Sequence, residues 1–565
     1  MVGRRRNVAK SVGRIRIATS GRSLISVFSA SKGTRVRKKF WVALLLLILG
    51  SSPAAANVIY VDCIGPNDPG SGRVQDPFRR IQPGLDAAIN GDTVEILPGI
   101  YTSPGNYDLD PGGKSITIQS IDPNDPCFAA NTIIDPNKAG RGFYIQNDED
   151  ANCIISGLTI RNARIPAGYN GAGIYCYDTS PTIRNCIIRD GYAEDGSGGG
   201  ICFDYGSATV INCTITGNTA GNYGYGGGIS CRFSSPTIIG CTISGNTAAL
   251  TGGGIDSGSS EPNILNCIII DNNAAAGGGI NCYYPGAANV INCTIVANSA
   301  EYAGGAVYCW SGGSAIIKNS ILWANSAIDG TQLGLDEQGT ASIAYCDVQS
   351  GQTEVYDPCG LLVWGGGNIN SDPCFASFDP NGDPNLWDFH LKSIYGRWDA
   401  AVFSAVDLTK NGFVDLQDFA VFGAQWLEEG IGLTADLDNN GKVDLLDLEI
   451  MLEAYPTAQP PQGMWVLDDT SSPCIDAGDP NSDWIAEPWP NSKRINMGAF
   501  GGTNQASKNG LKADFDVDGY VDFKDFSYLA TNWGTQQSCI EDLDKNGQVD
   551  VYDLGEFCVL WLEQN

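Results

Sequence analysis

Residues 198–220 read GGGICFDYGSATVINCTITGNTA, and residues 226–248 repeat the pattern as GGGISCRFSSPTIIGCTISGNTA. The unit recurs from about residue 170 to residue 350. Its second cysteine returns every 26 to 28 residues, at Cys186, Cys213, Cys241, Cys267, Cys293 and, after a Ser at position 320, Cys346. Three short β-prone runs separated by Gly and Asn turns fill each unit, which is typical of one coil of a parallel β-helix. Helical periodicity is absent from these units, which argues against a helical repeat.

Alternation along each strand predicts which side chains face inward, so Cys213 and Ile215 face the interior while Thr214 faces out. Stacked coils then place equivalent residues in columns, spaced by about 4.8 Å. One inward column comprises Cys153, Cys186, Cys213, Cys241, Cys267 and Cys293, and a second comprises Cys176, Phe203, Cys231, Ser257, Cys282 and Cys309. At the turn beside the first column we expect a ladder of amides from Asn152, Asn185, Asn212, Asn266 and Asn292.

The chain has 19 cysteines, a number that ordinarily indicates disulfides in an exported protein. Small sulfur-bearing side chains that face a packed interior instead favour buried free thiols. We expect Cys202, which is out of register, to point outward. Outside the columns, the better disulfide candidates are Cys359 with Cys374 and Cys539 with Cys558.

The chain is strongly acidic outside its N-terminal segment. Its 565 residues include 63 Asp or Glu and 34 Lys or Arg, a net charge of −29. Residues 1–56 hold 12 of the basic residues and no acidic one, so residues 57–565 carry 22 basic against 63 acidic residues, a net charge of −41. Such a body repels nucleic acid and attracts divalent cations, so we expect no nucleic-acid partner. The single histidine, His390, argues against His-ligated zinc and a Ser-His-Asp triad.

Residues 1–56 have the order of a secretory signal peptide: a basic stretch, a short apolar run over residues 40–49 and small residues at 54–56. The apolar run is shorter than the roughly 20 residues that a spanning helix needs. We expect cleavage near Ala56, a secreted or cell-surface location and no membrane span in the mature chain. An uncleaved anchor and a start codon placed too early are the alternatives.

Four short loops carry Asp or Asn at odd positions and Gly at position 6, the pattern of a calcium-binding loop. Calcium needs six or seven hard oxygens around one point, and short carboxylates, amides and the backbone carbonyl of position 7 supply them. The predicted ligands are Asp407, Thr409, Asn411, Phe413, Asp415 and Asp418; Asp436, Asp438, Asn440, Lys442, Asp444 and Asp447; Asp514, Asp516, Asp518, Tyr520, Asp522 and Asp525; and Asp542, Asp544, Asn546, Gln548, Asp550 and Asp553. Four such loops argue against chance, the alternative being Asx-rich turns that bind no metal.

Each loop precedes one apolar helix, as in Phe419–Leu427 and Phe526–Trp533, and has no matching helix before it. This duplicated loop-and-helix pattern, with Asp at position 12, resembles type I dockerin modules over residues 403–455 and 511–563. The resemblance implies calcium as the cofactor and a cohesin-like protein partner. Positions 10 and 11, for example Leu445-Leu446, differ from the hydroxyl pair common in that family.

From Asn57 onward the chain resembles the pectin-lyase-like right-handed β-helix family. Ile59–Asp62, the helical-looking stretch 78–88 and residues 91–101 are similar to the usual start of that family. The resemblance implies an all-β fold, a right-handed parallel β-helix or solenoid, and with the loop-and-helix pattern above we expect it to carry two small α-helical dockerin-like calcium modules. The same scaffold carries lyases, hydrolases, adhesins and surface proteins, so the function has to be argued from a site.

The chain order predicts an insertion, because strand-like runs at Phe389–Ser393 and Met464–Asp468 flank the first pair of calcium loops. The expected segments are a signal peptide at 1–56, a parallel β-helix at 57–398, an inserted dockerin-like module at 399–462, a last β-helix coil at 463–506 and a C-terminal dockerin-like module at 507–565.

The outward positions of the strand after each GGG are the expected binding face. Three steps past the Ile or Val, the repeats align Tyr177, Asp204, Arg232, Gly258, Tyr283 and Trp310 in one column. Aromatic rings stack on sugar faces, so Tyr177, Tyr283 and Trp310 are candidate ligand-binding residues. Asp256 lies in the neighbouring column, two coils from Asp204 and thus roughly 9.6 Å away, near the separation of an inverting carboxylate pair.

Asp204, Arg232 and Asp256 are therefore the candidate catalytic residues, although any exposed sheet carries polar and aromatic residues. His390 lies in a strand-like run and is expected to be structural. Together these features favour an exported calcium-binding β-helix protein that binds extracellular polysaccharide or joins a surface assembly through its dockerin-like modules. A polysaccharide lyase or glycoside hydrolase, with Arg232 or a carboxylate as base, is one alternative. A structural surface protein or adhesin is the other.

Overall fold

The computed structural model describes residues 56–399 except 284 and 381, and residues 464–508 except 489, 490, 492 and 493. It also describes residues 422, 425, 435, 442–443, 513, 515, 521, 523–534, 543 and 548–564. The predicted signal peptide up to residue 55 lies outside the described residues. So do the first two calcium loops apart from Lys442 and Val443.

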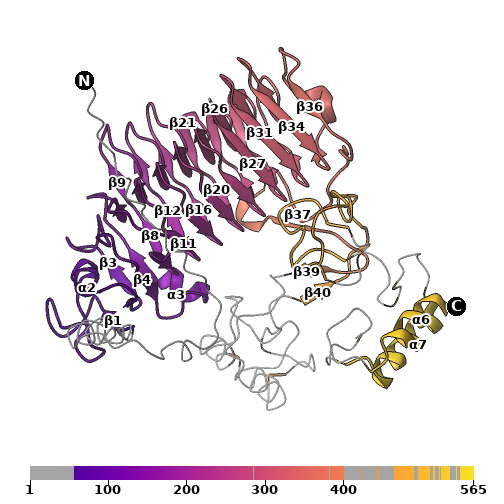
Figure 1. Ribbon diagram of the computed structural model, residues 1–565, viewed down its shortest axis with the longest axis horizontal. Helices are drawn as coiled ribbons and strands as arrows, with labels where there is room; N and C mark the ends of the chain where they lie inside the picture. The colour runs from indigo at the N-terminus through magenta and orange to yellow at the C-terminus, as the bar shows by residue number, and fades with distance from the viewer. Residues whose placement is uncertain are drawn as a thin grey trace, which may run out of the picture. The chain divides into compact units, whose positions relative to one another are not determined.

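The repeats form a parallel β-helix whose successive coils contribute strands to four sheets (Figure 1). Each complete coil passes in turn through sheets of eight, twelve, ten and six strands. For example, β14 pairs in parallel with β10 on one side and with β18 on the other. Three strands per coil were predicted, and the fourth is a short addition of two to five residues.

The strand bounds are as follows. The twelve-stranded sheet holds β1 (Val58–Val61), β2 (Thr93–Ile96), β4 (Thr117–Ser120), β7 (Ile154–Ser156), β11 (Thr182–Arg184), β15 (Thr209–Ile211), β19 (Thr237–Ile239), β23 (Asn263–Leu265), β27 (Ala287–Ile291), β31 (Ser314–Lys318), β34 (Thr340–Ala344) and β36 (Leu362–Trp364). The ten-stranded sheet holds β3 (Gly99–Tyr101), β5 (Thr132–Ile134), β8 (Thr159–Arg161), β12 (Ile187–Arg189), β16 (Thr214–Thr216), β20 (Thr242–Ser244), β24 (Ile268–Ile270), β28 (Thr294–Val296), β32 (Ile321–Trp323) and β35 (Asp347–Val348). The eight-stranded sheet holds β6 (Phe143–Ile145), β10 (Ile174–Tyr177), β14 (Ile201–Asp204), β18 (Ile229–Arg232), β22 (Ile255–Gly258), β26 (Ile280–Tyr283), β30 (Val307–Trp310) and β33 (Leu333–Leu335). The six-stranded sheet holds β9 (Arg164–Ile165), β13 (Tyr192–Ala193), β17 (Thr219–Ala220), β21 (Thr247–Thr251), β25 (Asn273–Ala276) and β29 (Ser299–Ala303).

The interior of the coils is built from columns of Ile, Val and Cys that are almost completely buried. The predicted cysteine column is confirmed, because these cysteines are free and buried. The amides of Cys186 and Cys213 each donate to the sulfur of the next cysteine in the column, at 3.4 Å. Burial raises the pKa of the Cys213, Cys241 and Cys267 thiols well above the ordinary value, so they stay protonated and behave as small apolar groups.

The predicted disulfide between Cys359 and Cys374 is wrong, since both residues are free in the structure. Cys359 lies exposed, whereas Cys374 is half-buried and its Sγ donates to the carbonyl of Asp372 at 3.4 Å. The other predicted pair includes Cys539, which lies outside the described residues. Cys202 aligns with Tyr175 and Ser230 on the outward side of the eight-stranded sheet, yet it is fully buried.

The GGG turns explain this burial. The first Gly of each turn has a positive φ, +66° at Gly226 and +68° at Gly252. A Cβ on Gly252 would lie 2.7 Å from the Cβ of Asp256, so only glycine lets the turn pack so closely over that outward side chain. As a result, one outward column of the sheet is covered rather than exposed. Its fully buried members are Cys202, Ser230, Asp256 and Asn281.

An asparagine ladder exists, but it is formed by different residues from those predicted. The predicted turn residues, for example Asn212 and Asn266, adopt a positive φ and remain partly exposed. The ladder is built instead by the equivalent Asn of successive repeats: Asn218 and Asn246 in Gly-Asn-Thr-Ala, Asn272 in Asp-Asn-Asn-Ala, and Asn298 and Asn325 in Ala-Asn-Ser-Ala. The Nδ2 of each of the first four donates to the Oδ1 of the next Asn at 2.9–3.0 Å, the Nδ2 of Asn325 donates to Gln332 at 2.7 Å, and all five Asn are buried. These bonds satisfy polar groups inside the coil that would otherwise destabilise it.

A short helix, α2 (Ile81–Ala87), packs against the first coils, as the sequence predicts. It buries Ile81 and Leu85, and the absent side chain of Gly84 brings its backbone close to Val61 and Val94. A second short helix, α3 (Pro126–Asn131), interrupts the third coil beside β5 and begins with Asp125 capping the amide of Cys127. The N-terminal coils are thus the only part of the described β-helix that is decorated with α-helix.

Beyond β36 the chain leaves the coil sheets. The 3₁₀ turn η1 (Gly351–Glu354) precedes β36. After β36, strands β37 (Phe375–Ser377) and β38 (Asp388–Leu391) form an antiparallel hairpin that includes η2 (Pro384–Leu386). Strand β39 (Arg397–Asp399) pairs antiparallel with β40 (Met464–Val466). The two ends of the predicted insertion are therefore adjacent.

The expected last coil over 463–506 is wrong, because β40 is the one strand that its described residues contribute and it pairs outside the coil sheets. The segment instead lies along the side of the ten-stranded sheet. Ile475 and Met497 join a core with Val296 and Ile321. Asn266 donates to the carbonyls of residues 499 and 501 at 2.9 and 2.8 Å, and the exposed turn amides of the coils thereby hold this segment.

The C-terminal described residues include α6 (Phe523–Thr531) and α7 (Val551–Gln564), which confirms a helix after each of the last two loops. Phe515, Leu529 and Phe557 belong to one buried cluster. Both helices begin inside the predicted loops, at position 10 of the calcium pattern. Among the helices of the described part of the chain, none is long and apolar enough to cross a membrane.

Candidate functional site

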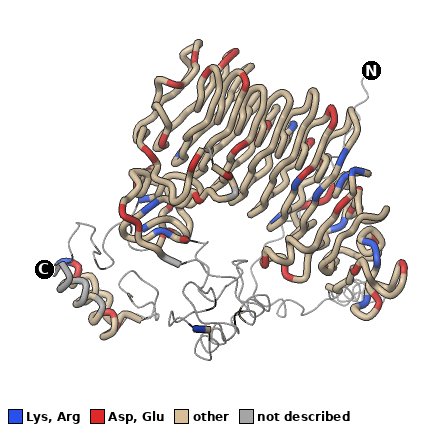
Figure 2. Tube along the Cα trace, turned by 180° about the vertical axis from the view of Figure 1, so that it is seen from behind, with Lys and Arg blue, Asp and Glu red and all other residues tan. Residues whose placement is uncertain are grey.

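The predicted column on the eight-stranded sheet is confirmed by the strand register. Tyr177 pairs with Asp204, Asp204 with Arg232, Arg232 with Gly258, Gly258 with Tyr283 and Tyr283 with Trp310. Uncharged stretches dominate the stacked strands in Figure 2. Asp204 and Arg232 are the charged pair in the middle of this column.

Asp204 and Arg232 form a half-buried ion pair, with Arg232 Nε 3.4 Å from Asp204 Oδ1. Asp204 Oδ2 also accepts from the Tyr175 hydroxyl at 2.8 Å and from Asn170 Nδ2 at 3.2 Å. Burial is the largest single influence and lowers the pKa of Arg232, but Asp204 together with Cys202, Tyr283 and Tyr175 outweighs it, so the net effect raises that pKa. Arg232 therefore stays cationic, and the carboxylate beside it is engaged on both oxygens.

Asp256 lies in the covered column and has no exposed surface. Its Oδ1 accepts from the Thr251 hydroxyl and from Asn281 Nδ2, both at 2.7 Å, while its Oδ2 is buried without a partner in the described structure. Burial raises the pKa of this carboxyl to about 7, although the two hydrogen bonds oppose the shift. The two candidate carboxylates therefore differ: Asp204 is tied into an ion pair and Asp256 is sealed below the surface.

Tyr283 and Trp310 form the aromatic end of the column, with ring centroids 5.7 Å apart and planes inclined by 31°. Tyr283 lies over Gly258, since a Cβ there would lie 2.3 Å from the tyrosine hydroxyl oxygen. The missing side chain at position 258 thus makes room for the ring next to Arg232. Burial, with Asp256 nearby, raises the pKa of Tyr283 to about 12, so its hydroxyl remains a donor at neutral pH.

A second aromatic group was missed at the sequence level. Tyr205 and Phe233 stack at 5.3 Å with nearly parallel planes, and Tyr177 meets Tyr205 edge-on at 5.8 Å. Tyr205 and Phe233 follow the strand residues directly and adopt a positive φ, which turns their rings to the outward side beside Tyr177. The sequence signal that could have identified them is an aromatic residue at the same position of two successive repeats. We name the set of Tyr177, Tyr205, Phe233, Tyr283 and Trp310 the aromatic strip.

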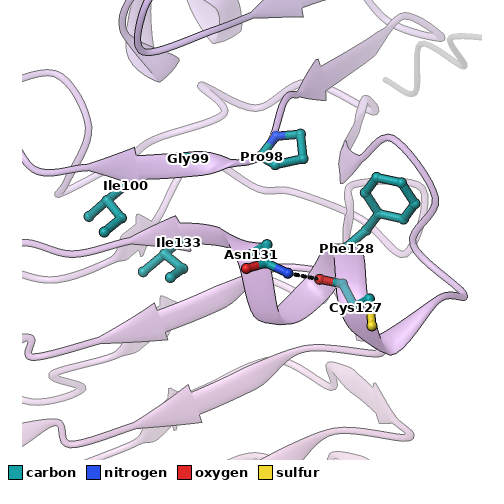
Figure 3. A pocket seen from close by; sticks show the side chains of 7 residues that line it. All are labelled: Pro98, Gly99, Ile100, Cys127, Phe128, Asn131 and Ile133. Carbon is teal, nitrogen blue, oxygen red and sulfur yellow. Dashed lines mark hydrogen bonds between the residues drawn. The ribbon is translucent and has the colours of Figure 1, made fainter. Parts of the chain in front are cut away.

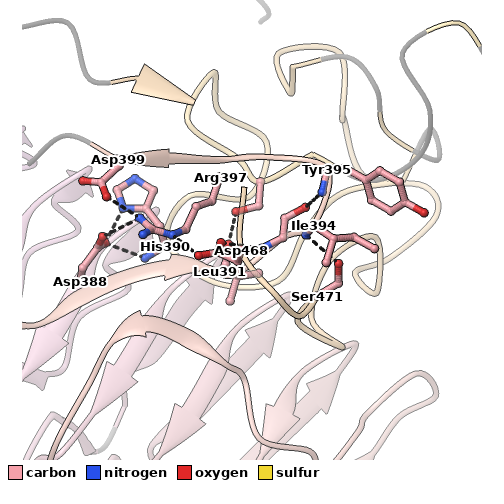
Figure 4. A network of polar contacts seen from close by, with 11 residues as sticks. Asp388, His390, Leu391, Ile394, Tyr395, Arg397, Asp399, Asp468 and Ser471 are labelled. Carbon is pink, nitrogen blue, oxygen red and sulfur yellow. Dashed lines mark hydrogen bonds and ion pairs between the residues drawn. The ribbon is translucent and has the colours of Figure 1, made fainter. Parts of the chain in front are cut away.

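His390 is not part of this face. It lies buried in a polar network between the hairpin and the chain that follows β40 (Figure 4). Its Nδ1 is 2.6 Å from Asp388 Oδ1, and its ring stacks on Phe500 at 3.6 Å. Arg397 bridges Asp399 at 3.0 Å and Asp468 at 3.1 Å. The network joins both sides of the predicted insertion, which fits a structural role for the histidine.

A cavity of about 460 Å³ lies beside α3 on the outer side of the ten-stranded sheet (Figure 3). Ile100, Phe128 and Ile133 line it, and Asn131 Nδ2 is bonded to the carbonyl of Cys127 at 2.9 Å. No charged side chain lines it among the described residues. This cavity therefore offers an apolar wall but no group with which to orient a polar ligand.

The calcium prediction falls mostly outside the described residues, which include Lys442, Asp525, Gln548, Asp550 and Asp553 of the predicted ligands. Asp525 Oδ1 accepts from the Phe515 amide at 2.6 Å, and Asp553 Oδ1 accepts from the Leu543 amide at 2.6 Å. Both bonds join position 12 to position 2 of a loop, and both carboxylates are buried.

Position 12 is thus folded back over the start of each loop, which is the placement that a closing calcium ligand requires. The two loops do this in the same way, and calcium binding stays a prediction because most of the predicted ligands lie outside the described residues. Within the described residues alone, no cluster of three or more His, Cys, Asp or Glu side chains is arranged to hold a metal.

The family model described as "Right handed beta helix region" matches residues 141–322, the segment that contains the regular repeats. The fold is a right-handed parallel β-helix. No curated protein matches the chain.

Among solved structures, the crystal structure of pectate lyase Pel9A is 15% identical with a TM-score of 0.42, over 80% of this chain and 98% of that one. A rhamnogalacturonan lyase is 14% identical with a TM-score of 0.26, over 58% and 94%. The GH136 lacto-N-biosidase from Eubacterium ramulus is 11% identical with a TM-score of 0.27, over 59% and 70%. These likenesses concern the fold and carry no argument about activity.

Proposed function

We propose that this protein is an exported, calcium-binding β-helix protein that binds extracellular polysaccharide along the aromatic strip. The observation that carries the proposal is the continuous outward column of the eight-stranded sheet, in which aromatic rings lie on both sides of the Asp204–Arg232 pair. Successive coils repeat at about the 4.8 Å spacing of neighbouring strands. A chain of sugar rings can therefore meet one ring or charged group after another along the sheet.

The chemistry of the strip suits sugars. Exposed faces of Tyr177, Tyr205 and Phe233 provide flat apolar surface, and each is about half exposed, at 46, 45 and 54%. Arg232 provides donors for hydroxyl or carboxylate groups beside the rings. Aromatic faces with a small number of placed polar groups are the usual composition of a ligand site.

Binding without chemistry is favoured over catalysis by the state of the two carboxylates. Asp256 is sealed and Asp204 is saturated by Tyr175, Asn170 and Arg232, so neither presents a free carboxylate to a glycosidic oxygen. Arg232 is a poor base because the carboxylate beside it stabilises its charged form. A lyase or hydrolase therefore remains the alternative outcome of the test rather than the proposal.

The second part of the proposal is that the calcium modules attach the β-helix to a protein partner. When bound, calcium would draw the carboxylates of each loop together and fix the following helix. Asp514, Asp516, Asp518, Asp522 and Asp525 would hold it in the third loop, and Asp542, Asp544, Asn546, Asp550 and Asp553 in the fourth. A folded module of this kind would tether the β-helix to a protein partner such as a cohesin-like domain outside the cell.

The proposal is tested by electrophoresis of the purified mature chain through gels that contain pectin, alginate or a neutral glucan. Retardation in at least one gel, lost in the double variant Tyr283→Ala with Trp310→Ala, is the expected result. Tyr302→Ala is the control, because Tyr302 is an exposed tyrosine that lies on β29 of the six-stranded sheet. Equal retardation of the double variant would remove the strip from consideration. Release of unsaturated uronides, read by ultraviolet absorbance, would replace the proposal with a lyase.

A further inference from the structure

A second cavity, of about 380 Å³, lies where the β37–β38 hairpin meets the coil end, on elements that do not contribute to the aromatic strip. We name it the hairpin pocket. The residues that matter for its chemistry are Trp323, Gln349, Asp372, Cys374, Phe378 and Lys392. A volume of this size is within the roughly 300–1,000 Å³ range of small-molecule sites.

One wall of the hairpin pocket is aromatic and rigid. Phe378 packs edge-on against Trp387 at 5.0 Å and against Phe375 at 5.9 Å, and Phe375 in turn meets Phe389 at 5.0 Å. Trp323, at the end of β32, lines the pocket from the coil side. Two aromatic side chains from separate elements thus bound a space large enough for one or two sugar rings.

The polar groups of the pocket are held by the backbone. The Lys392 amide donates to the Cys374 carbonyl at 3.0 Å, and the Ser472 amide donates to the Lys392 carbonyl at 2.9 Å, so the residue is fixed between the hairpin and the returning chain. Within 4.0 Å, the described residues offer the Lys392 ammonium no carboxylate. Gln349 Oε1 already accepts from the Ala324 amide at 2.7 Å and from Gln332 at 3.3 Å, which leaves its amide nitrogen as the group available to a ligand.

Asp372 lies at the same pocket and does not neutralise the lysine. Its Oδ1 accepts from the Cys374 amide at 2.9 Å, which orients the carboxylate, and the residue is exposed to solvent. A carboxylate of this kind accepts hydrogen bonds from ligand hydroxyls. The pocket therefore combines two flat apolar surfaces, one cation, one amide donor and one hydroxyl acceptor.

We propose that the hairpin pocket binds a sugar that carries a carboxylate, a uronic acid, with its ring against Phe378 and Trp323 and its carboxylate at Lys392. The strongly acidic body repels anions at long range, but at physiological salt exposed charges beyond about 8 Å are screened, so the groups of the pocket decide: Lys392 pairs with the ligand carboxylate and Asp372 accepts from its hydroxyls. The hairpin pocket is separate from the aromatic strip, so the proposal for the pocket does not depend on polysaccharide binding to the strip.

Cys374 provides a direct readout, because its half-buried free thiol lines the pocket. The rate at which iodoacetamide alkylates each native thiol is measured by peptide mass spectrometry with no ligand, with glucuronate and with glucose. Glucuronate should slow alkylation of Cys374 several-fold, glucose should have little effect, and exposed Cys359 should react at an unchanged rate in all three.

The variant Lys392→Gln keeps hydrogen-bonding capacity but removes the charge, and it should abolish the protection by glucuronate. Lys138→Gln, at an exposed lysine on the N-terminal coils, is the matched control and should keep it. Equal protection by glucose, unchanged protection in Lys392→Gln or no protection by glucuronate would each overturn the proposal. Loss of gel retardation in the Tyr283 and Trp310 variant bears on the strip alone and leaves this result untouched.

Discussion

Replacing the sealed carboxyl Asp256 by its neutral isostere is expected to stabilise the β-helix at alkaline pH and to leave it unchanged in acid. Asp256→Asn keeps an oxygen that accepts from Thr251 and Asn281. The new amide nitrogen replaces Oδ2, which has no partner in the described structure. Asp256 lies between Ser230 and Asn281 in the covered column. The substitution therefore removes a buried charge while the hydrogen bonds of the site survive.

The magnitude follows from the shift in pKa. Burial raises the folded-state pKa of Asp256 from 3.8 to about 7. The folded state therefore binds the proton more tightly than the unfolded chain, and stability falls as pH rises from about 4 through about 7. At about 1.36 kcal/mol per pKa unit, the ionised carboxylate costs roughly 4 kcal/mol above that range, to order of magnitude.

The assay is native-state hydrogen exchange of the amides around β22, with denaturant unfolding as a second readout, at about pH 4 and about pH 8.5, either side of the titration. Local exchange is preferred because a solenoid can unfold coil by coil. The advantage of Asp256→Asn over the natural chain should grow by several kcal/mol between the two pH values, to the order given by the shift. Asp178→Asn, at an exposed aspartate, should show no such growth. An advantage for Asp256→Asn that is equal at both pH values would refute the assignment of a buried, strained charge.

Three further predictions concern the coil core and the modules. Cys186, Cys213 and Cys241 should be alkylated only after unfolding, as read by mass spectrometry without reductant, and disulfides among them would contradict the thiol column. Asn246→Ala should destabilise its coil by about 3 kcal/mol or more, because it leaves the Asn218 backbone amide buried and unpaired, at about 1–3 kcal/mol, and removes three further buried side-chain bonds, to Asn218 Nδ2, the Ile215 carbonyl and Asn272 Oδ1. Asn289→Ala, which removes one half-buried bond to Asn263, should cost about 1 kcal/mol, and equal losses in denaturant unfolding would count against the ladder. Chelation of calcium should expose the amides of α6 and α7 to hydrogen exchange while the coil strands stay protected, since loop carboxylates repel one another without a cation; unchanged exchange in both helices would refute the metal assignment.

The repeat made the coil architecture predictable at the level of single residues. Because every coil has nearly the same length, one correctly aligned cysteine fixes the register of all its neighbours, and the column from Tyr177 to Trp310 followed from the same alignment. The inward or outward assignment was also sound, because alternation is a local property of a strand.

What failed depended on how neighbouring turns pack. Asp256 and Cys202 face outward as predicted but are covered by the GGG turns, a close approach that strand alternation does not encode. The Asn of Gly-Asn-Thr-Ala, for example Asn246, is a residue type typical of turns, yet its side chain points into the coil and forms the ladder. The segment after residue 463 has the composition of a coil but lacks the repeat, and it packs on the side of the sheet through Asn266 and Met497 instead.

The most direct test of the central claim is hydroxyl-radical footprinting of the mature chain with and without the polysaccharide that retards it. The account predicts that oxidation falls at Tyr177, Tyr205, Phe233, Tyr283 and Trp310, which share the outward face of the eight-stranded sheet. Tyr223 and Tyr302, exposed aromatic residues outside the strip, should be oxidised at the same rate in both conditions. Protection of Tyr302 or Tyr223 without protection of the strip would contradict the account, since the polysaccharide would then lie on another face of the β-helix.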